Sequence, residues 1–169
     1  MGCLISAAAA DGARADVAAL LHKGAKTLRP FERIVGRSDA FVSPGLIDVT
    51  GLAVPDAEIF APLLQVTRVG DFEAAVAAAN NTKFGLAAGL ITEDDRLWQR
   101  YLAGARAGVI NRNRPTSGAS ALMPFGGVGE SGNHRPASYY MADHVAYPAA
   151  SFEAPLVRDI RSEMKGLGG

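Results

Sequence analysis

Residues 63–111 alternate between short apolar runs and longer segments whose apolar residues recur at helical spacing. The runs at 63–69, 87–91 and 108–111 predict three β-strands, because each is an apolar segment of strand length. Strands joined by helix-length connections are typical of crossover units, which pair their strands in parallel. We therefore expect an α/β fold with three layers, in which crossover helices cover a mainly parallel sheet.

Polar residues predict where two crossover helices begin, because Asp and Thr side chains accept hydrogen bonds from the first free backbone N–H groups. Asp71 is expected to cap a helix that ends at Asn80 and Asn81. Thr92 is expected to cap the next helix, with Asp95 at its third helical position. The spacing predicts the apolar surfaces of the two helices: Phe72, Ala75, Val76 and Ala79 in the first, and Leu97, Trp98, Tyr101, Leu102 and Ala105 in the second.

The region before residue 63 predicts one helix followed by shorter extended segments. Ser6 is expected to cap a helix over 7–23, and Gly24 is expected to stop it. Strands are expected at 33–35 and 46–49, because polar residues and turn residues separate these apolar segments. This helix is expected to cover a sheet.

The region after residue 111 begins with a loop rich in Gly, Pro and Ser that covers 112–133. A loop of this length at the carboxyl ends of parallel strands indicates a ligand site. Pro136 is expected to open a short helix that ends near residue 142. The segment 144–152 then predicts a last extended strand, which Pro148 restricts to a sheet edge or to pairing on one side. We expect this segment to be available to a partner subunit.

The composition excludes several classes of function. The chain has 17 Lys and Arg residues against 17 Asp and Glu residues, so it has no net field to attract nucleic acid or anionic lipid. The longest apolar stretch, 4–10, is far too short to span a membrane, and no basic residue precedes it. We therefore expect a cytoplasmic protein. A pattern for N-myristoylation at 1–6 is the competing interpretation of the first residues, although no polybasic patch follows it.

The cysteine and histidine residues offer little chemistry of their own. A single cysteine, Cys3, excludes an intrachain disulfide and a Cys-based zinc site. The three histidines have no metal-ligand spacing, so we expect no bound metal. Cys3 is either a weakly activated nucleophile at the start of the first helix or an inert thiol, and the lack of a nearby basic residue favours the inert thiol.

A glycine motif at 127–132, Gly-Val-Gly-Glu-Ser-Gly, has two interpretations. It matches the Gly-x-Gly-x-x-Gly pattern of dinucleotide sites, and Glu153 lies about 20 residues further on, where that pattern expects an acidic residue. However, Pro124 weakens the strand that should precede the motif, and Pro136 interrupts the helix that should follow it. The second interpretation is that the glycines allow the backbone to approach a ligand or a neighbouring loop closely.

Two other segments carry candidate ligand-binding groups. The Glu58 carboxylate can accept hydrogen bonds from ribose hydroxyls beside the flat ring of Phe60, or these residues are simply an exposed Glu and a core Phe. Arg135, with Asn133 and His134, either holds a substrate carboxylate through a bidentate contact or is a solvated loop residue.

Four motifs, taken in order, resemble the C-terminal part of an aldehyde dehydrogenase. They are EIFAP at 58–62, NNTKFGLAAG at 80–89, GVIN at 108–111 and PFGGVGESG at 124–132. The loops at 111–115, 118–120 and 132–136 look most like those of the N-succinylglutamate 5-semialdehyde dehydrogenases of arginine catabolism. In two places the chain departs from the family: Ala61 stands in place of the usual Gly, and Arg112 stands where an aromatic residue is common.

This resemblance implies a role for particular residues. It assigns Glu58 to the nicotinamide-ribose hydroxyls of NAD, Phe60 to the nicotinamide side and Phe125 to the substrate tunnel. The residues it assigns to the acid end of the aldehyde are Gly118, Ala119, Ser120, Asn133, His134 and Arg135. The family's catalytic Cys, its general-base Glu and its cofactor domain would lie upstream of Met1, so no catalytic residue is expected in this chain. Residues 1–143 would then be a partial catalytic domain, and 144–169 an oligomerisation strand and tail that pairs with another copy.

Three functional hypotheses follow. The first is a C-terminal portion of an NAD(P)-dependent aldehyde dehydrogenase, which acts with the missing N-terminal part and is inactive alone. The second is a non-catalytic oligomerisation or binding module derived from the same family. The third is a small nucleotide-binding protein that uses the motif at 127–132. Under the first hypothesis we expect the chain to self-associate, because surfaces that the missing part covers would be exposed.

Overall fold

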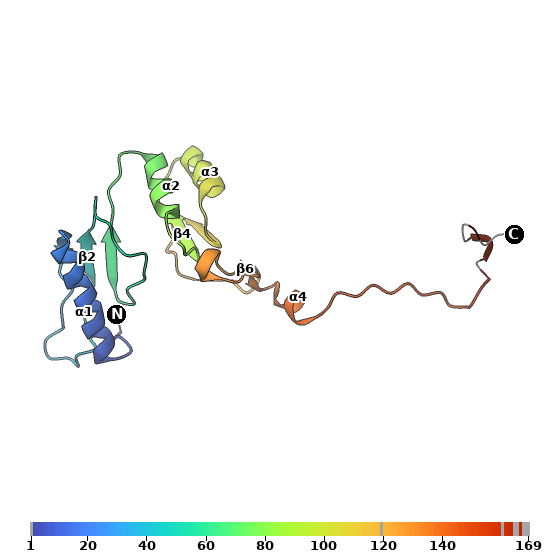
Figure 1. Ribbon diagram of the computed structural model, residues 1–169, viewed down its shortest axis with the longest axis horizontal. Coiled ribbons are helices and arrows are strands. Elements are labelled where there is room, and N and C mark those ends of the chain that lie inside the picture. The colour runs from blue at the N-terminus through green and yellow to red at the C-terminus, as the bar shows by residue number, and fades with distance from the viewer. Residues whose placement is uncertain (1, 119, 160, 164–165, 167–169) are drawn as a thin grey trace.

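The computed structural model describes residues 2–118, 120–159, 161–163 and 166, and these form two small folded regions followed by a long tail (Figure 1). We call residues 2–69 the N-terminal lobe, residues 70–145 the C-terminal lobe, and the described residues from 146 onward the tail. No helix within the described residues is both long enough and apolar enough to cross a membrane. The tail runs away from both lobes and includes one short 3-10 turn, η2 (Arg161–Glu163).

The N-terminal lobe consists of one long helix and a three-stranded sheet. The elements are α1 (Ala7–His22), β1 (Lys26–Arg29), β2 (Gly45–Asp48) and β3 (Leu63–Val66). In the sheet, β2 is the central strand, antiparallel to β1 and parallel to β3. The predicted helix cap is confirmed, since the Ser6 hydroxyl accepts a hydrogen bond of 3.1 Å from the Ala9 N–H. The predicted strand at 33–35 is reduced to an isolated bridge between Arg33 and Val42.

The core of this lobe forms where α1 packs against the sheet. The buried apolar residues are Ala10, Ala13, Val17, Leu20, Phe31, Val42, Ile47 and Val49. Their side chains form two adjoining clusters, and Ile59 and Leu63 pack against both. Ile47 is only 1% exposed, so the middle of β2 lies at the centre of the core. The expectation that the first helix covers a sheet is confirmed.

The C-terminal lobe begins with two helices and two strands. The elements are α2 (Phe72–Asn80), β4 (Ala87–Leu90), α3 (Asp95–Gly104) and β5 (Val109–Arg112). Strands β4 and β5 pair in parallel, with α3 as the crossover between them. The predicted cap of α2 is confirmed, because the Asp71 carboxylate accepts a hydrogen bond of 2.8 Å from the Ala74 N–H.

The cap of α3 differs from the prediction. The carboxylate of Asp94, not the hydroxyl of Thr92, accepts from the N–H groups of Arg96 (2.7 Å) and Leu97 (3.3 Å). Asp94 directly precedes the first helical residue, which is where a capping side chain reaches the free N–H groups. The Thr92 hydroxyl accepts instead from the Asp94 N–H, in the segment just before the helix.

The α/β class with parallel strand pairs and crossover helices is confirmed, but the described strands form three separate small sheets. The connection 49–62 brings β3 back beside β2, and the two strands pair from Gly45 with Leu63 onward. Only the second of the two predicted crossover units therefore pairs its own strands.

The third sheet replaces the predicted helix after Pro136. Strand β6 (Pro124–Phe125) pairs antiparallel with β7 (Ala137–Ser138). Ser138 has a φ of 60°, which a helix does not tolerate, so the helical prediction is wrong there. The helix α4 (Met141–Val145) begins later, and it includes the first two residues of the segment predicted to be extended from 144. Residues 146–154 continue without a strand partner among the described residues.

Candidate functional site

The glycine motif at 127–132 packs its backbone against neighbouring backbone. A Cβ on Gly129 would overlap the Lys83 carbonyl oxygen, and a Cβ on Gly132 would overlap that of Gly127. Gly129 also has a φ of 60°, which favours glycine. Residues Gly129–Ser131 form a single 3-10 turn, η1, rather than the start of a helix. This arrangement favours the close-approach interpretation over a phosphate-binding turn, because protein backbone already occupies the space beside the glycines.

Gly85 is the point where three segments of the C-terminal lobe meet. Its carbonyl oxygen accepts hydrogen bonds from the N–H groups of Gly108 (3.0 Å) and Val128 (3.1 Å). Its own N–H donates to the Ser131 hydroxyl over 3.0 Å. Lys83 strengthens the same junction through an ion pair of 3.0 Å with Glu130. The motif at 80–89 and the glycine motif therefore form one scaffold.

Beside this scaffold, the structure brings together two of the residues assigned to the substrate. Gly118 and Phe125 share a hollow with a cavity volume of about 230 Å³. Its other lining residues are Leu86, Ala87, Val109, Thr116 and Ser117. Strands β4 and β5 thus supply the floor and the loop 116–118 supplies one wall. Ala119, also assigned to the substrate, lies outside the described residues.

His134 lies at a neighbouring hollow. It lines a cavity of about 250 Å³ with Pro124 and Gly126, the residues on either side of Phe125. The His134 backbone has a φ of 64°. Asn133 fixes the approach to this turn, because its side-chain oxygen accepts a hydrogen bond of 3.0 Å from the Arg135 N–H. The Arg135 side chain is exposed and contributes to no ion pair among the described residues.

Ser120 is oriented by its own turn rather than by these hollows. Its hydroxyl accepts a hydrogen bond of 3.2 Å from the Leu122 N–H. Its carbonyl oxygen accepts from the Met123 N–H over 3.3 Å. The hydroxyl keeps a proton to donate to a ligand, because the Leu122 bond uses only its oxygen as an acceptor.

Glu58 and Phe60 lie on the N-terminal lobe. Glu58 lines a cavity of about 120 Å³ with Asp16 of α1 and with Lys23, which follows the helix directly. Phe60 is 81% exposed, so the alternative of a core Phe is wrong. An exposed carboxylate and an exposed flat ring two residues apart fit a ribose with an attached planar ring. This pair is therefore compatible with nicotinamide ribose, whereas the glycine motif is not compatible with the pyrophosphate.

Asp56, which the sequence analysis did not single out, ties the Glu58 segment to the C-terminal lobe. Its carboxylate accepts from the Lys83 N–H and from the Thr82 hydroxyl, each over 2.7 Å. The Lys83 backbone bond, followed by the Thr82 bond, lowers the pKa of Asp56. Because Lys83 also contacts the glycine motif, Asp56 links the proposed cofactor segment to the scaffold beside the substrate hollow. The only sign of this role in the sequence is that Asp56 lies two residues before Glu58.

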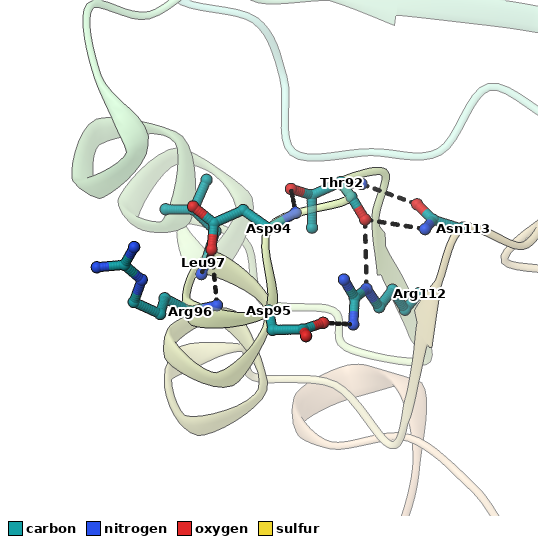
Figure 2. Close-up of polar contacts among 7 residues, drawn as sticks. All are labelled: Thr92, Asp94, Asp95, Arg96, Leu97, Arg112 and Asn113. Carbon is teal, nitrogen blue, oxygen red and sulfur yellow. Dashed lines mark hydrogen bonds and ion pairs between the residues drawn. The ribbon is translucent and has the colours of Figure 1, made fainter.

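Arg112 and Asn113 join the end of β5 to the start of α3 (Figure 2). The Arg112 guanidinium donates to the Asp95 carboxylate (2.5 Å) and to the Thr92 carbonyl oxygen (3.3 Å). The same group lies 6.0 Å from the centre of the Trp98 ring. Asn113 accepts from the Thr92 N–H (2.8 Å) and donates to the Thr92 carbonyl oxygen (2.9 Å). Arg112, which stands where the resemblance expects an aromatic residue, is therefore held by an ion pair, a hydrogen bond and a ring contact.

The parallel strand pairs, the crossover helix and the glycine scaffold together define an α/β fold. Residues 1–148 match the profile of the Aldehyde dehydrogenase family, and the chain belongs to this family.

Within the family, the chain is 55% identical over 167 residues to N-succinylglutamate 5-semialdehyde dehydrogenase 2 of Caulobacter vibrioides. That match covers 99% of the chain but only 34% of the relative, so the chain spans about a third of the length of the curated relatives it matches. Among solved structures, it is similar to succinate-semialdehyde dehydrogenase from Burkholderia pseudomallei, with a TM-score of 0.72 and 32% identity over 85% of this chain and 30% of that one. It is also similar to an aldehyde dehydrogenase of Mycobacterium tuberculosis complexed with NAD+, with a TM-score of 0.74 and 25% identity over the same shares of the two chains.

Proposed function

We propose that the chain acts as the C-terminal third of an NAD(P)-dependent aldehyde dehydrogenase that oxidises N-succinylglutamate 5-semialdehyde to N-succinylglutamate in arginine catabolism. The observation that carries this proposal is the 55% identity, over 99% of the chain, to a dehydrogenase named for that aldehyde. The hollow that Gly118 and Phe125 both line supports it, because a cavity of about 230 Å³ beside an aromatic ring offers room for an aldehyde chain. An activity that needs a reduced thiol also suits a cytoplasmic location.

On the cofactor side, Glu58 and Phe60 are the residues that would hold the nicotinamide ribose. The bound nicotinamide would accept a hydride from the substrate. The Glu58 carboxylate would accept hydrogen bonds from the ribose hydroxyls, and the exposed Phe60 ring would exclude water beside them. The Asp56 bonds to Thr82 and Lys83 would hold this segment in place during the reaction.

On the substrate side, the acid groups of the aldehyde would meet polar loop residues. The Ser120 hydroxyl, the Asn133 amide and the Arg135 guanidinium can each donate to a carboxylate. Phe125 would contact the apolar part of the substrate. Cys3 is exposed and has no basic residue near it in the sequence, so the nucleophile would come from another segment of the dehydrogenase.

The test is a chimera of the Caulobacter vibrioides relative in which this chain replaces the matched C-terminal third. We expect the chimera to reduce NAD in the presence of N-succinylglutamate 5-semialdehyde and the 169-residue chain alone to show no activity. A second chimera also carries Glu58→Gln. This variant should raise the KM for NAD, because the ribose hydroxyls lose a charged acceptor. A folded chimera that does not oxidise the aldehyde would contradict the proposal, and so would an active chain alone.

We also propose that the 144–152 segment joins the chain to a second copy. Tyr147 is 93% exposed and Phe152 is 99% exposed, although aromatic side chains ordinarily bury most of their surface. The same observation supports the second candidate function, a non-catalytic oligomerisation module. Intact mass spectrometry of the native polypeptide from its source cells separates the two functions. A product several-fold heavier supports the dehydrogenase, and a 17.6 kDa product supports the module.

A further inference from the structure

We infer that Arg112 is a positioning residue that fixes the wall of the hollow shared by Gly118 and Phe125. The inference deepens the proposed function and rests on it only for the effect on catalysis. Arg112 is the last residue of β5, and the chain leaves the sheet immediately after it to form the wall loop, residues 113–118. The orientation of this residue therefore decides the direction in which the loop starts.

Three groups contact the Arg112 guanidinium. These groups are the Asp95 carboxylate, the Thr92 carbonyl oxygen and the ring of Trp98. Figure 2 shows the first two contacts, which both reach across to the segment that leads from β4 into α3. Only a planar fork with several donors can make this set of contacts, so a lysine ammonium is not equivalent. The Arg112 side chain is 26% exposed, so water screens these contacts only in part.

The residues on either side of Arg112 extend this constraint to the wall loop. The Asn113 side chain makes two hydrogen bonds to the backbone of Thr92, and its own N–H donates to the Leu90 carbonyl oxygen over 3.0 Å. The Asn111 amide then donates to the Pro115 carbonyl oxygen over 2.8 Å. Thr116, which follows directly, lines the hollow with Ser117 and Gly118. Every residue from Arg112 to Thr116 is thus within one residue of an anchored group.

The strength of the constraint should reside in the combination of the three contacts. Asp95 is 85% exposed, and an exposed ion pair alone contributes little. A partly buried cation near a tryptophan ring and a bond to a backbone carbonyl add to it. Removal of Asp95 should therefore affect the loop much less than removal of Arg112.

The first test uses the 169-residue chain, which has a single tryptophan, so the fluorescence of Trp98 reports directly on its contact with Arg112. Hydrogen exchange is measured at the amides of Thr92 and Asn113. We expect Arg112→Met to increase exchange at these amides by about tenfold or more, because their hydrogen bonds open locally. It should also shift the Trp98 emission, and exchange in α1 should stay unchanged.

Arg100→Met is the matched control. Arg100 lies on the same helix as Trp98, pairs with the Glu73 carboxylate and lies 5.2 Å from the Phe72 ring, but it forms no hydrogen bond or ion pair with residues 113–118, all of which are described. It should leave exchange at Thr92 and Asn113 unchanged. Arg112→Lys, which keeps the charge and is compatible with folding, should give an intermediate increase. Exchange at these amides that is unchanged in both Arg112 variants would overturn the inference.

The second test uses the chimera described above. We expect Arg112→Lys to raise the KM for N-succinylglutamate 5-semialdehyde by about tenfold, with kcat and the KM for propanal little changed, since propanal has no acid end to contact the wall loop. Equal losses with both aldehydes would overturn the positioning role. If the unmodified chimera is inactive, the proposed function fails, and the exchange measurements still decide on Arg112.

Discussion

The two lobes are stabilised in different ways. Among the described residues, every buried apolar side chain belongs to the N-terminal lobe except Tyr101. The helix α2 has no buried residue, and α3 has only Tyr101. In the C-terminal lobe, backbone contacts at glycines and polar side chains take the place of a core. Burial of apolar surface is the main source of folding free energy, so we expect the C-terminal lobe to be the less stable one.

The polar contacts of the C-terminal lobe are specific but individually weak. Asn80 donates to the Gly104 carbonyl oxygen over 2.7 Å and accepts from the Arg106 N–H over 2.8 Å. The Arg106 guanidinium then donates to the Thr82 carbonyl oxygen. A hydrogen bond of this kind contributes about 1 kcal/mol net, which is less than one buried aliphatic side chain. The comparison teaches that the lobe with the proposed substrate hollow has its shape set by hydrogen bonds, while apolar burial holds the other lobe together.

The largest effect is expected in the core of the N-terminal lobe. Ile47→Ala should lower the free energy of unfolding by about 2–5 kcal/mol, because it leaves a cavity where the side chain is almost fully buried. Urea denaturation followed by circular dichroism measures it. The exposed control Val35→Ala should change little. The Trp98 fluorescence transition should shift less than the circular-dichroism transition, because Trp98 lies in the other lobe, which the Asp56 bonds to Thr82 and Lys83 join to this one. An equal shift in both signals would contradict the separate stabilisation of the two lobes.

Replacement of a glycine by alanine should change the stability of the two lobes in opposite directions. Gly108→Ala should destabilise the C-terminal lobe by about 1–3 kcal/mol, because the added methyl overlaps the Gly126 backbone. Gly12→Ala should stabilise the N-terminal lobe by about 0.5–1 kcal/mol, because Gly12 lies within α1 and its Cβ would meet nothing. Thermal unfolding by circular dichroism and Trp98 fluorescence measures the pair. A stabilising Gly108→Ala would contradict the backbone contact.

Acid is expected to act on the N-terminal lobe through Asp48. Hydrogen bonds from Thr50, and then from the Arg68 guanidinium, lower the pKa of Asp48 from 3.8 to about 2. A lowered carboxylate pKa stabilises the fold above the unfolded pKa, so this contribution is complete above pH 3.8 and is lost as the pH falls toward about 2. Urea midpoints between pH 2 and 5 should fall less in Asp48→Asn than in the parent chain. Identical pH profiles of the two proteins would show that protonation of Asp48 does not cause the loss of stability in acid.

The smallest effect is expected at the ion pair between Arg100 and Glu73. Both side chains are more than half exposed, so water screens their attraction. Glu73→Gln should change the free energy of unfolding of the C-terminal lobe by no more than about 0.5 kcal/mol. Trp98 fluorescence during urea denaturation measures it, and a loss of several kcal/mol would show that charge pairs stabilise this lobe more than its hydrogen bonds do.

The parts of the fold that the sequence predicts correctly depend on local interactions. Ser6 and Asp71 cap their helices as expected, because a cap involves only a side chain and the next three backbone groups. The position of β5 and its parallel pairing with β4 follow from apolar runs joined by a helix. The resemblance to aldehyde dehydrogenases likewise depended on the order of motifs along the chain, and the family match confirms it.

The parts that sequence could not predict depend on distant neighbours. Strand β1 was missed because all four of its residues are exposed, so no alternation marks it. The choice of β2 as the partner of β3 is made across the connection 49–62. The environment of Arg112 was equally hidden, because Asp95 and Trp98 come from a helix 14 to 17 residues earlier. The roles of the assigned site residues stay predictions.

The meeting of three segments at Gly85 also affects the order in which the chain folds during synthesis. The hydrogen bond from Gly85 to the Ser131 hydroxyl joins positions 46 residues apart. By contrast, the strands and helix of the N-terminal lobe are all present once residue 66 has been made. As a nascent chain leaves the ribosome, its N-terminal core can form first, while β4 and β5 wait for residues 126–138. The substrate-side half therefore cannot close before the glycine motif has been translated, so the rate of translation sets the shortest time for which it stays open.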